Sequence, residues 1–185
     1  GRRDSVYPNK TFIQMPHLQR LSVDGLNTEF GPELLKLQNL QHLEMGSSKV
    51  CHLKNITGSF FENVPFLRSF YLVECHSLIY INPAAFSKVH LQTLTFQSLP
   101  SFDLFTALRV LIGLQNSSLT ELRLIHLYNN TFYCKALRDE DAKYFSYLTL
   151  EVLDLTDNLL IYISKTVIDN LPNSLRILVL RNNRL

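Results

Sequence analysis

Apolar residues recur along the chain in short blocks, and the blocks return at a nearly regular interval. Residues 150–160 and 175–185 both fit the pattern L-x-x-L-x-L-x-x-N-x-L in full, and they lie 25 residues apart. Five weaker copies precede them. The seven blocks open at Leu18, Leu40, Leu67, Leu91, Leu119, Leu150 and Leu175. Their intervals are 22, 27, 24, 28, 31 and 25 residues, and periods of about 20 to 50 residues are typical of stacked repeats.

Within each block, apolar residues alternate with other residues, which is the period of a β-strand. One such unit cannot bury its own apolar edge, so neighbouring units must stack to form a common core. We therefore expect residues 1–185 to form a single α/β solenoid. Its curved parallel sheet should line the concave face, with irregular loops and short helices on the convex face. Residues 102–114 are expected to be helical, with a further short helix near residues 136–145.

The position that follows each strand predicts how the turn is held. Asn158 and Asn183 point inward there, and their side-chain amides can pair buried backbone groups. Ser48 and Cys75 occupy the same position and bond more weakly. In the other three repeats the position is apolar: Leu26, Leu99 and Leu127. At these three turns we expect irregular stacking, or another way of pairing the backbone.

Composition and charge exclude several classes of protein. The chain is 46% hydrophobic and 18% charged, which excludes a disordered chain. No run of 18 apolar residues is present, so none of these segments should span a membrane. The net charge is +2 with scattered lysines and arginines, and no basic stripe for nucleic acid is visible.

The sequence contains no arrangement that is typical of catalysis. The motifs G-x-S-x-G and H-E-x-x-H and a phosphate-binding loop are all missing. The Cys-His pairs at residues 51–52 and 75–76 do not have zinc-finger spacing, and the acidic run at residues 139–141 is expected to be a solvated turn. We expect a non-enzyme with no cofactor and no metal site.

Four N-x-S/T sequons offer sites for N-linked glycans, and all fall in predicted turns or at the ends of repeats. Their asparagines are Asn9, Asn55, Asn116 and Asn129. Occupied sequons would place the chain in the secretory pathway. The alternative is ordinary polar turn chemistry, in which asparagine, serine and threonine are common.

Three cysteines leave the thiol chemistry open. Cys51 follows one turn and Cys75 lies in the next, so a disulfide between adjacent repeats is one candidate. That bond requires Cα atoms within about 7 Å. The alternative for Cys75 is a buried free thiol. If the pair forms, Cys134 is either free or bonded to a partner outside this sequence.

Residues between the inward leucines should form an extended surface, which stacked repeats commonly use for binding. Its central row mixes acidic, basic and neutral residues: Ser22, Glu44, Tyr71, Thr95, Arg123, Asp154 and Val179. The candidate ligand or partner surface consists of Tyr71, Val73, Arg123, Ile125, Val152, Ile177 and Val179. Scattered surface β-formers are the alternative explanation. The mixed charge leaves lipid, protein and glycan ligands open.

The chain resembles the leucine-rich repeat superfamily over nearly its whole length, and more narrowly it looks like part of a Toll-like receptor ectodomain. The resemblance is carried by the uneven repeat lengths, by the recurring phenylalanines that precede the strands, and by the segment INPAAF at residues 81–86. It implies an innate-immune pattern-recognition receptor that binds a ligand and signals by dimerisation. The parent protein would be membrane-anchored, with this part on the cell surface or in the endosomal lumen.

That resemblance also carries expectations about what lies outside these residues. The sequence contains no cysteine-rich cap module, transmembrane helix or cytoplasmic signalling domain. We therefore expect an internal fragment of a longer array, with residues 1–17 as the tail of an interrupted repeat. Two alternatives stay open: an extracellular adhesion or matrix protein with leucine-rich repeats, and a cytosolic leucine-rich repeat scaffold.

Overall fold

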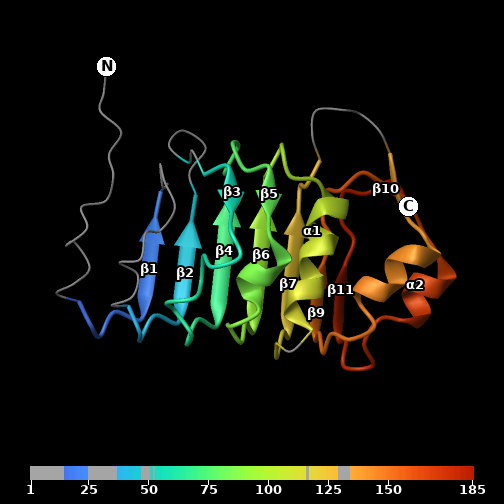
Figure 1. The fold of residues 1–185 in the computed structure, drawn as a ribbon. Coiled ribbons are helices and arrows are strands. Elements are labelled where there is room, and N and C mark those ends of the chain that lie inside the picture. The colour runs from blue at the N-terminus through green and yellow to red at the C-terminus, as the bar shows by residue number, and fades with distance from the viewer. Residues whose placement is uncertain (1–14, 25–36, 47–50, 52, 116, 129–133) are drawn as a thin grey trace, which may run out of the picture.

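Seven parallel strands form one sheet, and their order across the sheet is their order along the chain (Figure 1). The computed structural model describes residues 15–24, 37–46, 51, 53–115, 117–128 and 134–185. The strands are β1 (Arg20–Val23), β2 (His42–Met45), β4 (Ser69–Val73), β6 (Thr93–Gln97), β7 (Glu121–Ile125), β9 (Val152–Asp154) and β11 (Ile177–Val179). The predicted α/β fold with a parallel sheet is confirmed.

Short elements fill the connections between these strands. Two small parallel sheets pair β3 (Asn55–Ile56) with β5 (Tyr80–Ile81), and β8 (Lys135–Leu137) with β10 (Leu160–Ile163). The helices are η2 (Pro83–Phe86), α1 (Leu104–Val110), η3 (Leu111–Leu114), η4 (Asp139–Tyr144) and α2 (Lys165–Asp169). The helix expected over residues 102–114 is thus α1 followed by η3, and the one expected near residues 136–145 is η4, preceded by β8.

Register and burial explain why the strands form where they do. One inward row joins Leu21, Leu43, Phe70, Leu94, Leu122, Leu153 and Leu178 as direct neighbours. A second inward row joins Val23, Met45, Leu72, Phe96 and Leu124. Apart from Leu178, all of these side chains are buried. Their removal from water is the main term that holds adjacent units together.

Phenylalanine rings pack behind the strands and link successive units. The Phe61 ring lies 5.1 Å from the Phe86 ring and 4.9 Å from the Phe70 ring. Farther along, the Phe96 ring contacts those of Phe70 and Phe102 at 6.4 and 5.6 Å. Aromatic pairs at these separations contribute about 0.5 to 1.5 kcal/mol beyond the burial of their area.

The turns after the strands are stacked through their backbones. Glu74, Ser98, His126 and Asp157 all have positive φ angles of 53° to 57°. The backbone N–H of each donates to a carbonyl of the following unit, at Gln97, Ile125, Thr156 and Arg181, over 2.9 to 3.1 Å. The turns that carry Leu99 and Leu127 are therefore stacked like the others. A left-handed backbone costs a non-glycine residue about 1 to 2 kcal/mol, which this regular bonding offsets.

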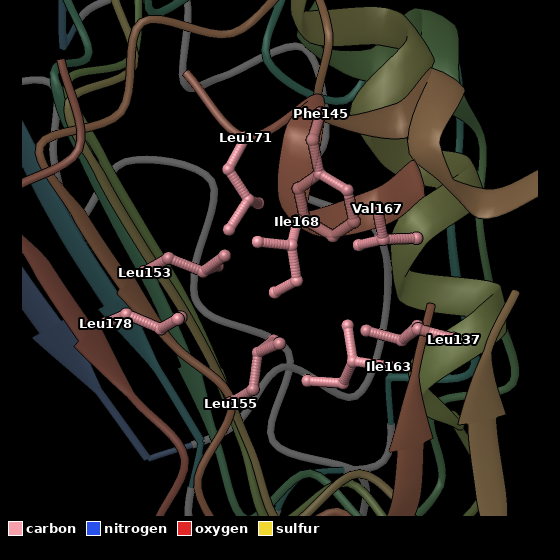
Figure 2. A pocket seen from close by; sticks show the side chains of 9 residues that line it. All are labelled: Leu137, Phe145, Leu153, Leu155, Ile163, Val167, Ile168, Leu171 and Leu178. Atoms are coloured by element: carbon pink, nitrogen blue, oxygen red, sulfur yellow. The ribbon is translucent and has the colours of Figure 1, made fainter. Parts of the chain in front are cut away.

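Within the described part of the chain, β11 is the last strand of the sheet and pairs on one side alone. Leu178 is 39% exposed, whereas its register neighbour Leu153 is 1% exposed. Behind these strands an apolar pocket opens beneath α2 (Figure 2). It is lined by Leu137, Phe145, Leu153, Leu155, Ile163, Val167, Ile168, Leu171 and Leu178. Because all nine lining side chains are apolar, this pocket is an incompletely covered part of the core.

Candidate binding surface

The side chains between the inward rows lie on the other face of the sheet, which we call the open face. The central predicted row is in register across it, from Ser22 through Glu44, Tyr71, Thr95, Arg123 and Asp154 to Val179. A second row places Val73, Gln97 and Ile125 side by side. The candidate residues therefore fall into two groups on one face: Tyr71, Val73, Arg123 and Ile125 over β4 to β7, and Val152, Ile177 and Val179 at β9 and β11.

The first group surrounds a buried threonine. Thr95 lies between Tyr71 and Arg123 and is only 4% exposed. Within the described part of the chain, its hydroxyl has no hydrogen-bond partner. On the other side, the Tyr71 ring lies 4.8 Å from the ring of His42. Burial, together with the Arg20 charge, lowers the pKa of His42, although the Glu44 charge opposes this shift.

The charge of Arg123 is neutralised within the face. Its Nε donates to the carboxylate of Glu121, and its Nη1 lies 3.8 Å from Asp154 Oδ2. The other carboxylate oxygen of Asp154 accepts a hydrogen bond from the Thr156 N–H at 2.9 Å. Arg123 thus acts as a bridge between β7 and β9 rather than as an unpaired cation.

The second group lies beside the open end of the sheet. Ile177 is 51% exposed, and its register neighbour Val152 is partly buried. Val179 pairs in the same way with Asp154. Leu178, on the opposite face of the same strand, is also exposed. The apolar character of this group is therefore continuous with the uncovered end of the sheet.

The side-chain amides of Asn158 and Asn183 form a ladder of hydrogen bonds between successive turns. Asn158 is fully buried, and its Oδ1 accepts the Leu127 N–H at 2.9 Å. Its Nδ2 donates to the carbonyls of Leu124 and Leu155 at 2.6 and 3.0 Å. Asn183 repeats the arrangement: its Oδ1 accepts the Asn158 N–H at 3.0 Å. Ser48 lies outside the described residues.

Cys51 and Cys75 form a disulfide between adjacent units, with Cα atoms 5.1 Å apart. Both cysteines are buried, at 4% and 0% exposure. Cys75 thus occupies the turn position as half of a disulfide rather than as a free thiol. Cys134 is a free, exposed cysteine.

Of the four sequon asparagines, Asn55 can be placed. It lies in β3, its side chain is exposed, and its strand pairs with β5 through the backbone. A glycan there would extend into solvent without disturbing that pairing. Asn9, Asn116 and Asn129 lie outside the described residues.

Two polar pairs between repeats were not predicted. Lys135 Nζ bonds to Asp103 Oδ2 at 2.9 Å and lies 5.3 Å from the centre of the Phe105 ring. His126 Nδ1 lies 2.7 Å from Asp157 Oδ2. His126 and Asp157 are 31 residues apart, the interval between their repeats, and occupy equivalent turn positions. Comparing such positions between successive repeats is the sequence signal that could have found this pair. Asp103 and Lys135 are 32 residues apart and are not at equivalent positions.

Asp103 has a second role, since its Oδ1 accepts the Thr106 N–H at 2.8 Å and so caps the start of α1. Burial raises the pKa of Asp103, but the bonds from Lys135 and Thr106 outweigh it and hold the pKa below its ordinary value of 3.8. The site therefore favours the charged carboxylate.

Within the described ranges, no group of three or more histidine, cysteine, aspartate or glutamate side chains is placed to hold a metal ion. No helix in the same ranges is long and apolar enough to cross a membrane. Comparison of the chain with models of known protein families, and with curated protein sequences, returned no match.

Proposed function

We propose that this chain is a leucine-rich repeat solenoid from the ectodomain of a Toll-like receptor of innate immunity, which binds a ligand and signals by dimerisation. The observation that carries the proposal is the sheet order: seven parallel strands follow the chain with their inward rows in register. Stacked leucine-rich units require that order. The amide bonds of Asn158 and Asn183, which link successive turns, also support the proposal. The open face would be the concave, ligand-binding side.

An extracellular location is supported by two further features. The disulfide between Cys51 and Cys75 joins adjacent units, and such bonds persist in oxidising compartments such as the cell surface and the endosomal lumen. The exposed Asn55 stands in a sequon on β3. The same two features weigh against the cytosolic scaffold.

A longer array is supported by the open end at β11. Leu178 and Ile177 are 39% and 51% exposed, and the pocket beneath α2 has only apolar walls. A further repeat packed there would cover both. Both observations support the proposal that the chain belongs to a larger ectodomain.

The second candidate is an extracellular adhesion or matrix protein, which the disulfide and the sequon at Asn55 favour equally. The full transcript separates the two. A transmembrane helix followed by a cytoplasmic signalling domain is expected for the receptor. Leucine-rich repeats without such a domain would replace the receptor proposal with the adhesion protein.

Secretion of the chain from a eukaryotic cell tests the extracellular location. We expect its intact mass to fall after enzymatic removal of N-glycans. Asn55→Gln should remove one glycan from the untreated protein, whereas Asn170→Gln, an exposed asparagine outside any sequon, should leave the mass of attached glycan unchanged. A protein whose mass is the same before and after treatment would contradict the extracellular location.

A further inference from the structure

We propose that the open face over β4, β6 and β7 binds an uncharged oligosaccharide. This inference rests on the proposed ligand-binding function and adds the chemical class of the ligand. It starts from Thr95, whose hydroxyl is buried without a hydrogen-bond partner in the described part of the chain. Leaving a buried polar group unpaired costs about 1 to 3 kcal/mol. A ligand hydroxyl above the sheet would supply the missing bond.

The direction of Thr95 follows from the strand. Its chain neighbours Leu94 and Phe96 are both fully buried on the inward face, so Thr95 points to the open face. Its register neighbours there are Tyr71 and Arg123. The hydroxyl therefore faces the open side of the sheet but lies covered between two long side chains, so a ligand reaches it when Tyr71 or Arg123 moves aside.

Around Thr95, groups that form hydrogen bonds alternate with apolar ones. Along β6, its outward neighbours are Thr93 and Gln97. Gln97 stands in register between Val73 and Ile125, so these two apolar side chains are about 10 Å apart, or two strand spacings. A protein interface usually has a continuous apolar core. A pyranose ring instead presents hydroxyl edges beside a C–H face, which matches this alternation.

Tyr71 supplies the flat apolar surface that a sugar ring needs. It is partly exposed, and contact with His42 at 4.8 Å between ring centres supports its ring on one side. Its two register neighbours, Glu44 and Thr95, both carry hydrogen-bonding groups. A sugar that packs on this ring can reach the Thr95 hydroxyl on the adjacent strand, since neighbouring strands lie about 4.8 Å apart.

The lack of an unpaired cation beside Thr95 disfavours an anionic sugar, and the exposed Glu44 carboxylate next to Tyr71 would repel one. The outward residues of β4 and β6 are all uncharged at neutral pH: Ser69, Tyr71, Val73, Thr93, Thr95 and Gln97. The nearest cation in their rows, Arg123, is already paired with Glu121 and Asp154. Sulfated or phosphorylated ligands require unpaired cations, which this part of the face does not offer.

Calorimetric titration of the secreted 185-residue protein tests the proposal, with a soluble β-1,3-glucan, an α-mannan and chitohexaose as neutral probes and heparin as the anionic probe. We expect saturable, salt-insensitive binding of at least one neutral probe. Thr95→Val should weaken that binding about fivefold, the equivalent of one hydrogen bond of about 1 kcal/mol. Tyr71→Ala should weaken it about tenfold.

Stability measurements separate binding from folding. Thr95→Val removes an unpaired buried hydroxyl, so its melting temperature should equal or exceed that of the unaltered protein. Ser22→Ala, on the same face at β1, should leave affinity unchanged. Binding of heparin alone, binding of none of the three neutral probes, or equal affinity of Thr95→Val and Ser22→Ala would each overturn the proposal. If a protein ligand alone bound the glycosylated chain, the receptor function would stand and the oligosaccharide would not.

Discussion

Single polar side chains help to fix one repeat to the next. The side-chain amide of Asn158 accepts one hydrogen bond. It donates to the carbonyl of Leu124 in the preceding unit and to that of Leu155 in its own unit. The carboxylate of Asp103 connects a helix cap to a lysine in the next repeat. Both residues act between units, so their removal should weaken stacking rather than one local turn.

Asn158→Ala should lower the free energy of unfolding by about 3 kcal/mol, because several buried backbone groups lose their partner at once. Asn170→Ala is the matched control. The Asn170 side chain also bonds to a backbone carbonyl, that of Thr166, but it is exposed, so we expect a change within about 0.5 kcal/mol. Urea denaturation followed by circular dichroism measures both. If both variants lost the same free energy of unfolding, the buried amide of Asn158 would not stabilise the stacking of the turns.

Asp103→Asn should remove an acid-sensitive part of the stability. The folded-state pKa of Asp103 lies below its ordinary value of 3.8, so its contribution is complete above that pH and is lost as the pH falls through the lowered pKa. At pH 7 the variant should lose about 1 to 2 kcal/mol, since the Lys135 side chain is only 11% exposed.

The pH dependence provides the control for that variant. The difference in melting temperature between Asp103→Asn and the unaltered protein should shrink as the pH falls below about 4. Asp169→Asn breaks an ion pair with Lys165 whose side chains are 54% and 86% exposed, and should change stability by less than about 0.5 kcal/mol. A constant difference at all pH values would contradict the role of the Asp103 charge.

At the scale of elements, the strands were the predictable part. Alternating inward residues set the register of all seven, because a shift by one residue would turn leucines such as Leu122 to the open face. The backbone stacking of the turns was not predictable in detail. Glu74, Ser98 and His126 adopt positive φ angles that their residue types do not favour, because bonds to the following unit impose that conformation.

The small sheets were missed for a related reason. β3 and β5 each have two residues, too few to show a periodic pattern, and they form because the neighbouring unit offers its backbone. The surroundings of Thr95 likewise depend on which residues stand beside it in β4 and β7. The strand pattern predicts that Thr95 lies on the open face. Its burial and its unpaired hydroxyl depend on how the neighbouring side chains pack, which the pattern does not show.

Gly113→Ala should disrupt the packing of η3 on η2. A Cβ atom at Gly113 would lie 1.8 Å from the carbonyl oxygen of Pro83, so backbone must shift, and we expect a cost of about 2 kcal/mol or more. Gly58→Ala is the control, because a Cβ there would meet its nearest atom at an ordinary 3.5 Å. We expect that variant to stay within about 1 kcal/mol of the unaltered protein. Thermal denaturation compares the stability of the two variants. An equal decrease in melting temperature would contradict the close packing of η3 on η2.

At the scale of the whole molecule, burial is uneven along the array. Interior units are covered on both sides, and their inward leucines are almost completely buried, as Leu122 and Leu153 illustrate. The unit at β11 is covered on one side alone. The stability of stacked units is approximately a sum of unit and interface contributions, so the β11 end should open before the middle.

Leu153→Ala and Leu178→Ala compare the two environments with the same chemical change. The leucines are register neighbours, 1% and 39% exposed respectively. We expect Leu153→Ala to cost about 3 kcal/mol, in the range for a buried leucine, and Leu178→Ala about 1 kcal/mol. Hydrogen exchange should also show faster amide exchange in β11 than in β7. Equal costs would show that Leu178 is buried in solution.

The measurement that tests the central claim most directly is the thiol pairing of the secreted protein, mapped by differential alkylation and peptide mass analysis. An extracellular array with adjacent units stacked in this register should contain a Cys51–Cys75 linked peptide and one free thiol at Cys134. Both the oxidising compartment and the proximity of two successive turns are needed for that result. Three free thiols, or a bond from Cys134 to either of the other cysteines, would contradict the account.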